Sequence, residues 1–337
     1  MKFKYFLKYF SFRSIYHAMP VYNFNWTKSK GFFQSLLGDT LITVVDVGAR
    51  SGSAEELEPL ASNICFIGFD ADSDEVQRLN TQLSTYAKSK YVASFVGQKK
   101  GRVSFDLHKE AGNSSIYQFS SEYTKWFRRD KSDPVKQTFL INTDSLDNLI
   151  DHDVDFIKLD TQGTEFEIIC GAPRCVGSAL MVESELEFIE MYKGQKLAHD
   201  VIGMMSDQGF ELLYLNRVFM NSAQYGGSSR GQLIFGDALF GVSRKRALEL
   251  SVEKKMKYCA LLINYGLNDF AFDLYDESPD LQQYCPKIGE YLKKKGKPPL
   301  FIKRALITIF DKLIFALMTA RKTNGLGYDS DRSWPIR

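Results

Sequence analysis

Residues 41–52 read LITVVDVGARSG, and this stretch decides the fold class. Its first seven residues form an apolar, β-branched run, which is typical of a central strand that is covered on both faces. Glycines in the second half let the backbone turn tightly, since a Cβ would collide there. The stretch therefore predicts a buried strand that ends in a tight turn.

The same pattern repeats outward from this strand. A helix is expected to open near Ser53, a second strand at NICFIGFD (63–70), and a second helix from Ser73. Further strands are expected at KYVASFV, RVSFDL, QTFLIN, VDFIKLD, SALMVESE, FELLYLN and DALFGV. Strands that alternate with helices over roughly 200 residues predict an α/β fold with a doubly wound, mainly parallel, Rossmann-like sheet.

Charge divides the chain into three regions. Residues 1–38 hold six basic and no acidic residues and form a basic, aromatic N-terminal arm. Residues 39–243 carry the core domain, and residues 244–337 form a helical C-terminal extension. The whole chain has 43 basic and 41 acidic residues, which is too balanced for a surface built to bind nucleic acid.

The cysteines and the apolar segments bear on location. Five cysteines form no CxxC pair and no zinc-site spacing, so we expect reduced thiols in a cytoplasmic protein. No signal-peptide pattern and no run of about 18 uncharged apolar residues is found. Residues 300–322 follow a lysine-rich stretch and pattern as a basic amphipathic helix. Two interpretations stay open: contact with the inner face of a membrane, or docking on the core or in a homo-oligomer.

Sheets of this class bind ligands at the carboxyl ends of their strands, so the first turn is the place to expect a site. Its spacing, D-x-G-x-x-x-G, differs from the G-x-G-x-x-G that cradles a pyrophosphate. An acid there repels phosphate but accepts a hydrogen bond from an ammonium group. Asp70 ends the second strand near the roughly 20-residue offset at which a carboxylate binds ribose hydroxyls, while Asp72 suits a helix cap. These features favour S-adenosylmethionine over a dinucleotide. The expected cofactor contacts are Asp46, Gly48, Ala49, Gly52, Asp70 and Ala71.

A second cluster of acids follows the strand VDFIKLD. Asp160 ends that strand, Gly163 permits a turn, and Glu165 opens the next helix, where its charge suits the helix dipole. Glu183 and Glu185 share one face of a later strand because side chains alternate there. They are either functional groups or a pair of solvated charges.

The chain resembles the FkbM-type S-adenosylmethionine-dependent methyltransferases over roughly residues 44–242. Seven segments carry the resemblance, in this order: VVDVGARSG, FIGFDADSDEVQRLN, TDSLDNLI, DFIKLDTQGTEFEIICGA, VESELEFIEMYKGQKL, GFELLYL and GQLIFGDALF. The resemblance implies a class I methyltransferase fold and O-methylation of a hydroxyl, often on a sugar or a polyketide. We therefore expect a carbohydrate acceptor, such as a surface glycan. Two rivals are a SAM-binding module without activity and an NAD-dependent oxidoreductase, which the absent G-x-G-x-x-G weakens.

Methyl transfer to a hydroxyl depends on positioning and benefits from a base. The family pattern makes Asp160 the first catalytic candidate, as base or as acceptor-orienting group, and Glu183 the second. His199 is a third, because histidine is the usual general base, although a helix-surface position suits it equally. Clustered carboxylates also suit Mg²⁺, but no metal site is assigned. Residues 111–129, rich in serine and aromatics, suit either a lid or a surface excursion, and Ser114, Ser115 and Tyr117 are the residues to test.

Overall fold

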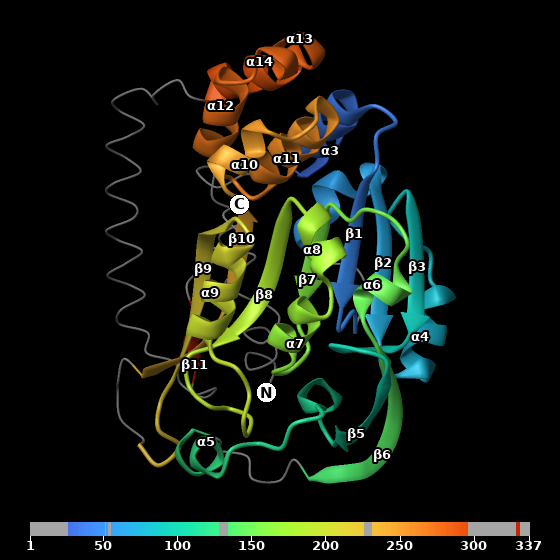
Figure 1. Cartoon of the computed structure of the whole chain (residues 1–337), viewed down its shortest axis with the longest axis vertical. Coiled ribbons are helices and arrows are strands. Elements are labelled where there is room, and N and C mark those ends of the chain that lie inside the picture. The colour runs from blue at the N-terminus through green and yellow to red at the C-terminus, as the bar shows by residue number, and fades with distance from the viewer. Residues whose placement is uncertain are drawn as a thin grey trace, which may run out of the picture.

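An eight-stranded sheet forms the centre of the molecule (Figure 1). The computed structural model describes residues 26–50, 52, 55–127, 134–225, 231–295 and 328–330. The strands lie in the spatial order β11 (Tyr328–Ser330), β9 (Phe210–Met220), β10 (Gln232–Val242), β8 (Met181–Glu187), β7 (Phe156–Leu159), β1 (Ile42–Val47), β2 (Ile64–Asp70) and β3 (Lys88–Ala93).

Strands β3, β2, β1, β7 and β8 run parallel, whereas β10, β9 and β11 join in antiparallel pairs. This confirms the prediction of a doubly wound, mainly parallel sheet. Strand order reverses at β1, which lies between β2 and β7, and such a switch point is where these sheets bind ligands. Successive residues of β1 and β7, such as Val44 with Val45 and Phe156 with Ile157, are fully buried, so both faces of the central strands are covered.

Two expectations about local structure were wrong. The strands expected at RVSFDL and QTFLIN do not join the main sheet. They form β5 (Gly101–His108) and β6 (Val135–Asp144), which pair with β4 (Phe95–Val96) in a separate sheet. Their residues alternate or lie exposed, so they lack the apolar runs of strands covered on both faces. The helix that was expected to open near Ser53 is a 3₁₀ helix, η1 (Glu55–Asn63). It contains Pro59, which has no N–H for an α-helical hydrogen bond.

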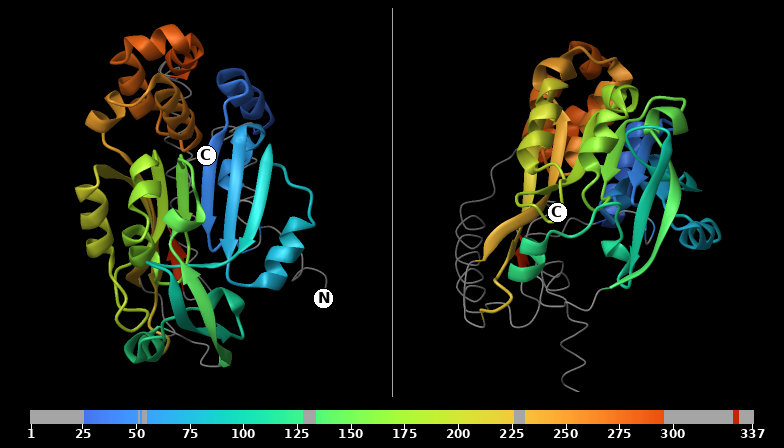
Figure 2. Two further views of the ribbon diagram at one scale, coloured as in Figure 1. Left: turned by 45° about the vertical axis from the view of Figure 1, so that its right-hand side comes forward. Right: turned by 60° about the horizontal axis from the view of Figure 1, so that its bottom comes forward.

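Short helices surround the main sheet (Figure 1). They are α3 (Trp26–Leu37), α4 (Ser73–Asn80), η2 (Ala111–Asn113), α5 (Ser121–Trp126), α6 (Leu146–Leu149), α7 (Glu165–Cys170), α8 (Pro173–Ser178) and α9 (Ala198–Asp207). Among the described residues, five more follow β10: α10 (Arg244–Leu248), α11 (Val252–Asn264), α12 (Asn268–Asp276), α13 (Pro279–Tyr284) and α14 (Pro286–Lys295). These five lie at one end of the main sheet, and the small sheet lies at the other (Figure 2).

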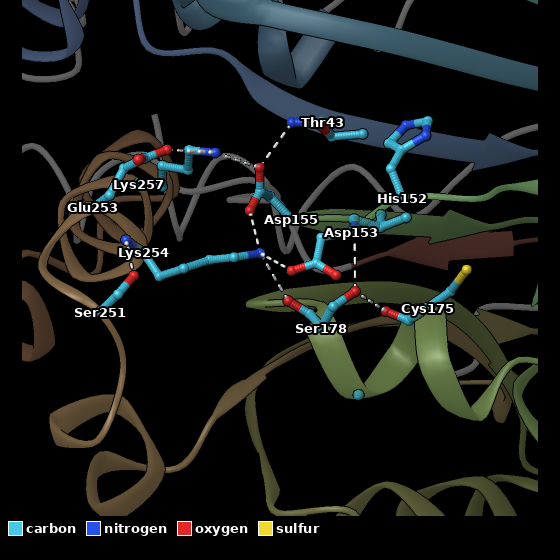
Figure 3. Close-up of polar contacts among 12 residues, drawn as sticks. Thr43, His152, Asp153, Asp155, Cys175, Ser178, Ser251, Glu253, Lys254 and Lys257 are labelled. Carbon is cyan, nitrogen blue, oxygen red and sulfur yellow. Dashed lines mark hydrogen bonds and ion pairs between the residues drawn. The ribbon is translucent and has the colours of Figure 1, made fainter.

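A buried ion cluster joins α11 to the amino ends of the central strands (Figure 3). Asp155, directly before β7, accepts hydrogen bonds from Lys254 Nζ (2.8 Å), Lys257 Nζ (3.1 Å) and the Thr43 backbone N–H (2.9 Å). Only 2% of the Asp155 surface is exposed. We call Asp155, Lys254, Lys257 and Thr43 the amino-end latch, because it holds the C-terminal helices against the core.

The remaining expectations about organisation concern the two ends of the chain. The predicted boundaries at 38/39 and 243/244 stay predictions. Most of the N-terminal arm and the amphipathic helix expected at 300–322 lie outside the described residues. Within the described ranges, no helix combines the length and apolar character that crossing a membrane requires.

Candidate active site

The turn after β1 is built against the end of β7. The backbone N–H groups of Gly48 and Ala49 both donate to the Phe69 carbonyl, which ties the turn to β2. Gly48 has φ +87°, and a Cβ there would lie 2.0 Å from the Asp160 carbonyl oxygen. Only glycine fits this position, because the conformation is left-handed and the neighbouring backbone fills the space. The sequence predicted a close approach to a ligand; the structure adds a close approach to β7.

A cavity of about 570 Å³ opens at the carboxyl ends of β1, β2 and β7. Three of the six expected cofactor residues line it, namely Gly48, Asp70 and Ala71, and so does the catalytic candidate Asp160. Asp46, Ala49 and Gly52 are not among its lining residues. The volume lies within the range of about 300 to 1,000 Å³ that is common for small-molecule sites.

One wall of this cavity is aromatic, which the sequence did not predict. Phe95, Phe105 and Phe139 come from the three strands of the small sheet, and all three line the cavity. Their rings contact in sequence, with centroids 5.7 Å apart for the first pair and 5.6 Å for the second. The ring planes are inclined to one another by 67° and 55°, so the wall is apolar and uneven, and a nucleobase can pack against one of its rings. No local signal marks these residues, because their meeting depends on how the small sheet pairs.

Asp70 presents its carboxylate to the cavity at the end of β2. It is 9% exposed and accepts a hydrogen bond from the Asp72 N–H at 2.8 Å. Burial raises the pKa of Asp70, and the nearby Arg50 guanidinium partly opposes that rise. Asp72 caps α4 by accepting from the N–H groups of Asp74 and Glu75, as the sequence predicted. Asp70 is therefore the acid at this edge that is left to meet ribose hydroxyls.

Behind the cavity, three charged residues lie side by side on β1, β7 and β8. Asp46 is in register with Lys158, which is in register with Glu183. The Lys158 ammonium lies 3.9 Å from Glu183 Oε1 and 4.0 Å from Asp160 Oδ2. We call Asp46, Lys158 and Glu183 the inner row. Lys158 therefore lies on a polar face near the end of β7, as its charge within an apolar run predicted.

Burial controls the protonation of the inner row. It raises the pKa of Asp46 to about 6 and that of Glu183 to about 7, and the Lys158 charge opposes both shifts. The carboxylates around Lys158 raise its pKa in turn, so the lysine stays charged. Tyr265, at the end of α11, donates to Glu183 Oε2 at 2.8 Å and helps to bury it. Glu183 is therefore sealed beneath the C-terminal helices and does not line the cavity.

The three catalytic candidates are not brought together. Asp160 lines the cavity, and 46% of its side chain is exposed. Glu183 is linked to it only through Lys158. The His199 side chain, on α9, is 78% exposed, lies 3.7 Å from Asp200 and is not among the cavity residues. The structure thus places His199 on a helix surface, which is the alternative that the sequence left open.

The loop after β7 holds Asp160 in place. Gln162 Nε2 donates to Asp160 Oδ1 at 3.1 Å, while Tyr192 and Ser115 donate to the Gln162 side chain and carbonyl at 2.7 and 2.8 Å. Gln162 has φ +59°, a left-handed conformation that is uncommon without glycine. Strained residues of this kind persist where the surroundings fix them, often at active sites.

Glu165 has a structural role in the same loop. Its carboxylate accepts from the backbone N–H groups of Thr161 (2.7 Å) and Gly163 (3.0 Å) and from the Thr161 hydroxyl (2.9 Å). It opens α7, as predicted, but it is buried, and burial raises its pKa to about 7 despite these donors. Glu165 therefore closes the loop that carries Asp160.

The segment that was expected to be a lid or a surface excursion contributes to the cavity wall. Gly112 and Ser114 line the cavity. Ser115 anchors the loop through Gln162, and the Tyr117 hydroxyl donates to Glu167 Oε1 at 2.8 Å. This part of 111–129 is therefore tied to the site, while residues 128–129 lie outside the described part.

No metal site was assigned from the sequence, and that stays a prediction. Across the part of the chain that the structure describes, no three His, Cys, Asp or Glu side chains converge as a metal site. The carboxylates that suggested Mg²⁺ are instead spread along neighbouring strands.

Comparison with known proteins identifies the domain. Residues 46–212 match the family described as the methyltransferase FkbM domain. No curated protein matches the chain. Among solved structures, a methyltransferase FkbM from Methylobacillus flagellatus is similar at 15% identity and a TM-score of 0.33 over 59% of this chain and 44% of that one. The chain thus spans less than half of that protein's length.

Two further solved structures are similar at a comparable level. An rRNA methylase from Streptococcus thermophilus shares 11% identity, with a TM-score of 0.32 over 64% of this chain and 94% of that one. A precorrin-6y C5,15-methyltransferase from Geobacter metallireducens shares 13%, with a TM-score of 0.31 over 64% and 86%. The family match and the observed strand order agree on the class I methyltransferase fold. None of these comparisons supports the NAD-dependent alternative.

Proposed function

Because residues 46–212 belong to the FkbM methyltransferase family and S-adenosylmethionine is therefore the methyl donor, we propose that this chain methylates a hydroxyl group of a carbohydrate. The observation that carries the proposal is the position of Asp160. Its carboxylate borders the donor-sized cavity, is partly exposed and is held by Gln162. A group so placed can meet an acceptor at the same edge that receives the donor.

The residues around the cavity fit an adenosyl donor. Asp70 offers a carboxylate for ribose hydroxyls, and the wall of Phe95, Phe105 and Phe139 offers an apolar surface for the base. When bound, S-adenosylmethionine supplies a methyl group on a positively charged sulfur. An acid placed tightly against that charge would oppose its loss in the transition state, so positioning of the acceptor oxygen should supply most of the rate.

We assign Asp160 two tasks. It orients the acceptor hydroxyl by accepting its hydrogen bond, and it takes the hydroxyl proton as the methyl carbon leaves sulfur for the acceptor oxygen, which would yield the methyl ether and S-adenosylhomocysteine. Gln162 fixes one carboxylate oxygen, at 3.1 Å, and Lys158 lies 4.0 Å from the other. Both contacts fix the direction in which the Asp160 carboxylate points.

Labelled methyl transfer to extracted surface glycans tests this proposal. The chain is incubated with methyl-labelled S-adenosylmethionine, and the products are weighed intact and then treated with mild base. A methyl ether survives that treatment, whereas a methyl ester does not. We expect base-stable label in the glycan, and little with Asp160→Asn. Label found only in protein or in a small lipid-free metabolite would contradict the carbohydrate assignment. Binding of S-adenosylhomocysteine without any transfer would instead support an inactive binding module.

A further inference from the structure

A second line of polar residues runs from the cavity across the sheet. Glu185 is the next residue after the register pair Leu159 and Ser184, so it lies beside Asp160. Glu185 is in register with Asp237 on β10, and Asp237 with Asn216 on β9. We call Asp160, Glu185, Asp237 and Asn216 the outer row. Since neighbouring strands lie about 4.8 Å apart, this row extends roughly 14 Å from the cavity edge.

The outer row offers mainly acceptors for hydrogen bonds. One N–H of Asn216 Nδ2 donates to Asp237 Oδ2 at 2.9 Å, and the amide oxygen of Asn216 can accept from a ligand. That oxygen has no hydrogen-bond partner, although Asn216 is just 8% exposed. Within the described ranges, no hydrogen bond to the Glu185 carboxylate is found, whereas the Glu185 carbonyl accepts from Ser184 Oγ at 3.1 Å. The side chains of Glu185 and Asp237 are neither fully buried nor fully exposed. A buried amide oxygen without a donor is costly unless a ligand supplies one.

The described residues offer the outer row little positive charge. Burial raises the pKa values of Glu185 and Asp237, the neighbouring carboxylates raise both further, and Lys158 opposes the shift of Asp237. Lys158 is already shared with Asp46 and Glu183. Among the described residues, no group of three or more His, Cys, Asp or Glu side chains could hold a metal ion. Negative charge spread along a line suits an extended organic cation better than a compact ion.

From this arrangement we propose that the outer row binds the acceptor and that the acceptor is an amino-sugar glycan. This inference rests on the proposed function and names its substrate class. The ammonium group of the sugar lies against Glu185 and Asp237, ring hydroxyls donate to the Asn216 oxygen, and the hydroxyl to be methylated lies at Asp160. A neutral sugar would satisfy the oxygens but would leave the carboxylate charges unpaired.

Titration with two matched oligosaccharides tests the proposal. The probes are a trimer of glucosamine and its fully N-acetylated counterpart, which keeps the ring hydroxyls and loses the ammonium charge. The full chain is saturated with S-adenosylhomocysteine, and binding is followed by calorimetry. We expect the amine form to bind at least about tenfold more tightly, since hydrogen bonds to charged groups contribute about 1.5 to 3 kcal/mol.

Two variants assign the effect to the outer row. Asp237→Asn and Glu185→Gln should remove the preference for the amine, whereas Asp207→Asn, at an exposed end of α9, should keep it. Thermal unfolding checks that each variant is folded. Equal affinity for the two probes, or no binding of either, overturns the proposal.

The same pair of probes separates this inference from the function on which it rests. Extracted glycans are divided, and one half is N-acetylated before the methyl-transfer assay. Label that enters both halves equally overturns the amino-sugar inference and leaves the carbohydrate function standing. Label that enters neither half contradicts the carbohydrate function, while the titration still decides the inference.

Discussion

Strand β7 has buried acids at both of its ends, and the protein treats the two ends differently. At the amino end, Asp155 is matched by two lysines and a backbone N–H. At the carboxyl end, one lysine, Lys158, interacts with three carboxylates, those of Asp46, Glu183 and Asp160. The ion pairs at the amino end hold α11 against the core. At the carboxyl end, burial raises the pKa values of Asp46 and Glu183 behind the cavity, while the partly exposed Asp160 lines the cavity and can meet a ligand.

The largest effect is expected from breaking the backbone contact at the carboxyl end with Gly48→Ala. The added Cβ would lie 2.0 Å from the Asp160 carbonyl at a φ of +87°, so the turn and the strand end must separate. Affinity for S-adenosylhomocysteine, measured by calorimetry, should fall at least about a thousandfold. Gly203→Ala is the matched control, because a Cβ there meets nothing within 4 Å and lies in a helix. An unchanged affinity would show that the turn does not form the donor site.

Removing the charge at the amino end should cost stability and leave donor binding intact. In Asp155→Asn, Lys254 and Lys257 lose their buried partner, and the free energy of unfolding should drop by about 3 kcal/mol. Urea unfolding measures this loss. Asp280→Asn, which breaks a half-exposed pair with Lys255, should cost much less. Equal losses of unfolding free energy in the two variants would contradict the stabilising role of the amino-end latch.

Asp160→Asn tests the acid that faces the cavity. It should lower kcat about a hundredfold, in the range of general-base losses, with little change in donor affinity. Steady-state kinetics at saturating donor gives kcat, and calorimetry gives the affinity. A kcat within a few-fold of the unmodified chain would remove Asp160 from the mechanism.

The two ends should also differ in their response to pH. The folded-state pKa values of Asp46 (about 6) and Glu183 (about 7) lie above the ordinary values of 3.8 and 4.5. Stability linked to such groups is fully present below the ordinary pKa and is lost as pH rises through the folded one. The free energy of unfolding should therefore increase as pH falls from about 8 to about 5.

Glu183→Gln should flatten this pH dependence. The exposed acid Glu249 provides the control, and Glu249→Gln should leave the slope as it is. Urea unfolding at several pH values compares the two variants. Equal slopes would mean that burial of the inner row does not control its protonation.

The smallest effect is expected away from both ends. The His199 side chain is 78% exposed and lies 3.7 Å from Asp200, so His199→Ala should change kcat/KM by less than about twofold. The methyl-transfer assay measures it. A loss of tenfold or more would restore the catalytic assignment that the sequence allowed.

These contrasts separate what local sequence predicts from what it does not. Apolar runs such as 41–47 and 63–70 predicted the central strands, and the turn and Asp70 predicted the cavity edge, because each depends on neighbouring residues. Asp160, the first catalytic candidate, lines the cavity, and its catalytic role stays a prediction.

The remaining features depend on register between distant strands. Asp46 was expected to contact the cofactor, but its pairing with Lys158 places it behind the cavity, where η1 and α11 bury the inner row. The aromatic wall arises only when β4, β5 and β6 form their own sheet. The partners of Asp155 come from α11, about a hundred residues further along the chain. No local pattern carries that information.

A crystal structure with S-adenosylhomocysteine tests the central claim most directly. We predict the nucleoside in the cavity, with its ribose hydroxyls within hydrogen-bond distance of the Asp70 carboxylate, its base against the phenylalanine wall and its sulfur toward Asp160. A nucleoside bound elsewhere, or a cavity that stays empty at saturating concentration, would contradict the account.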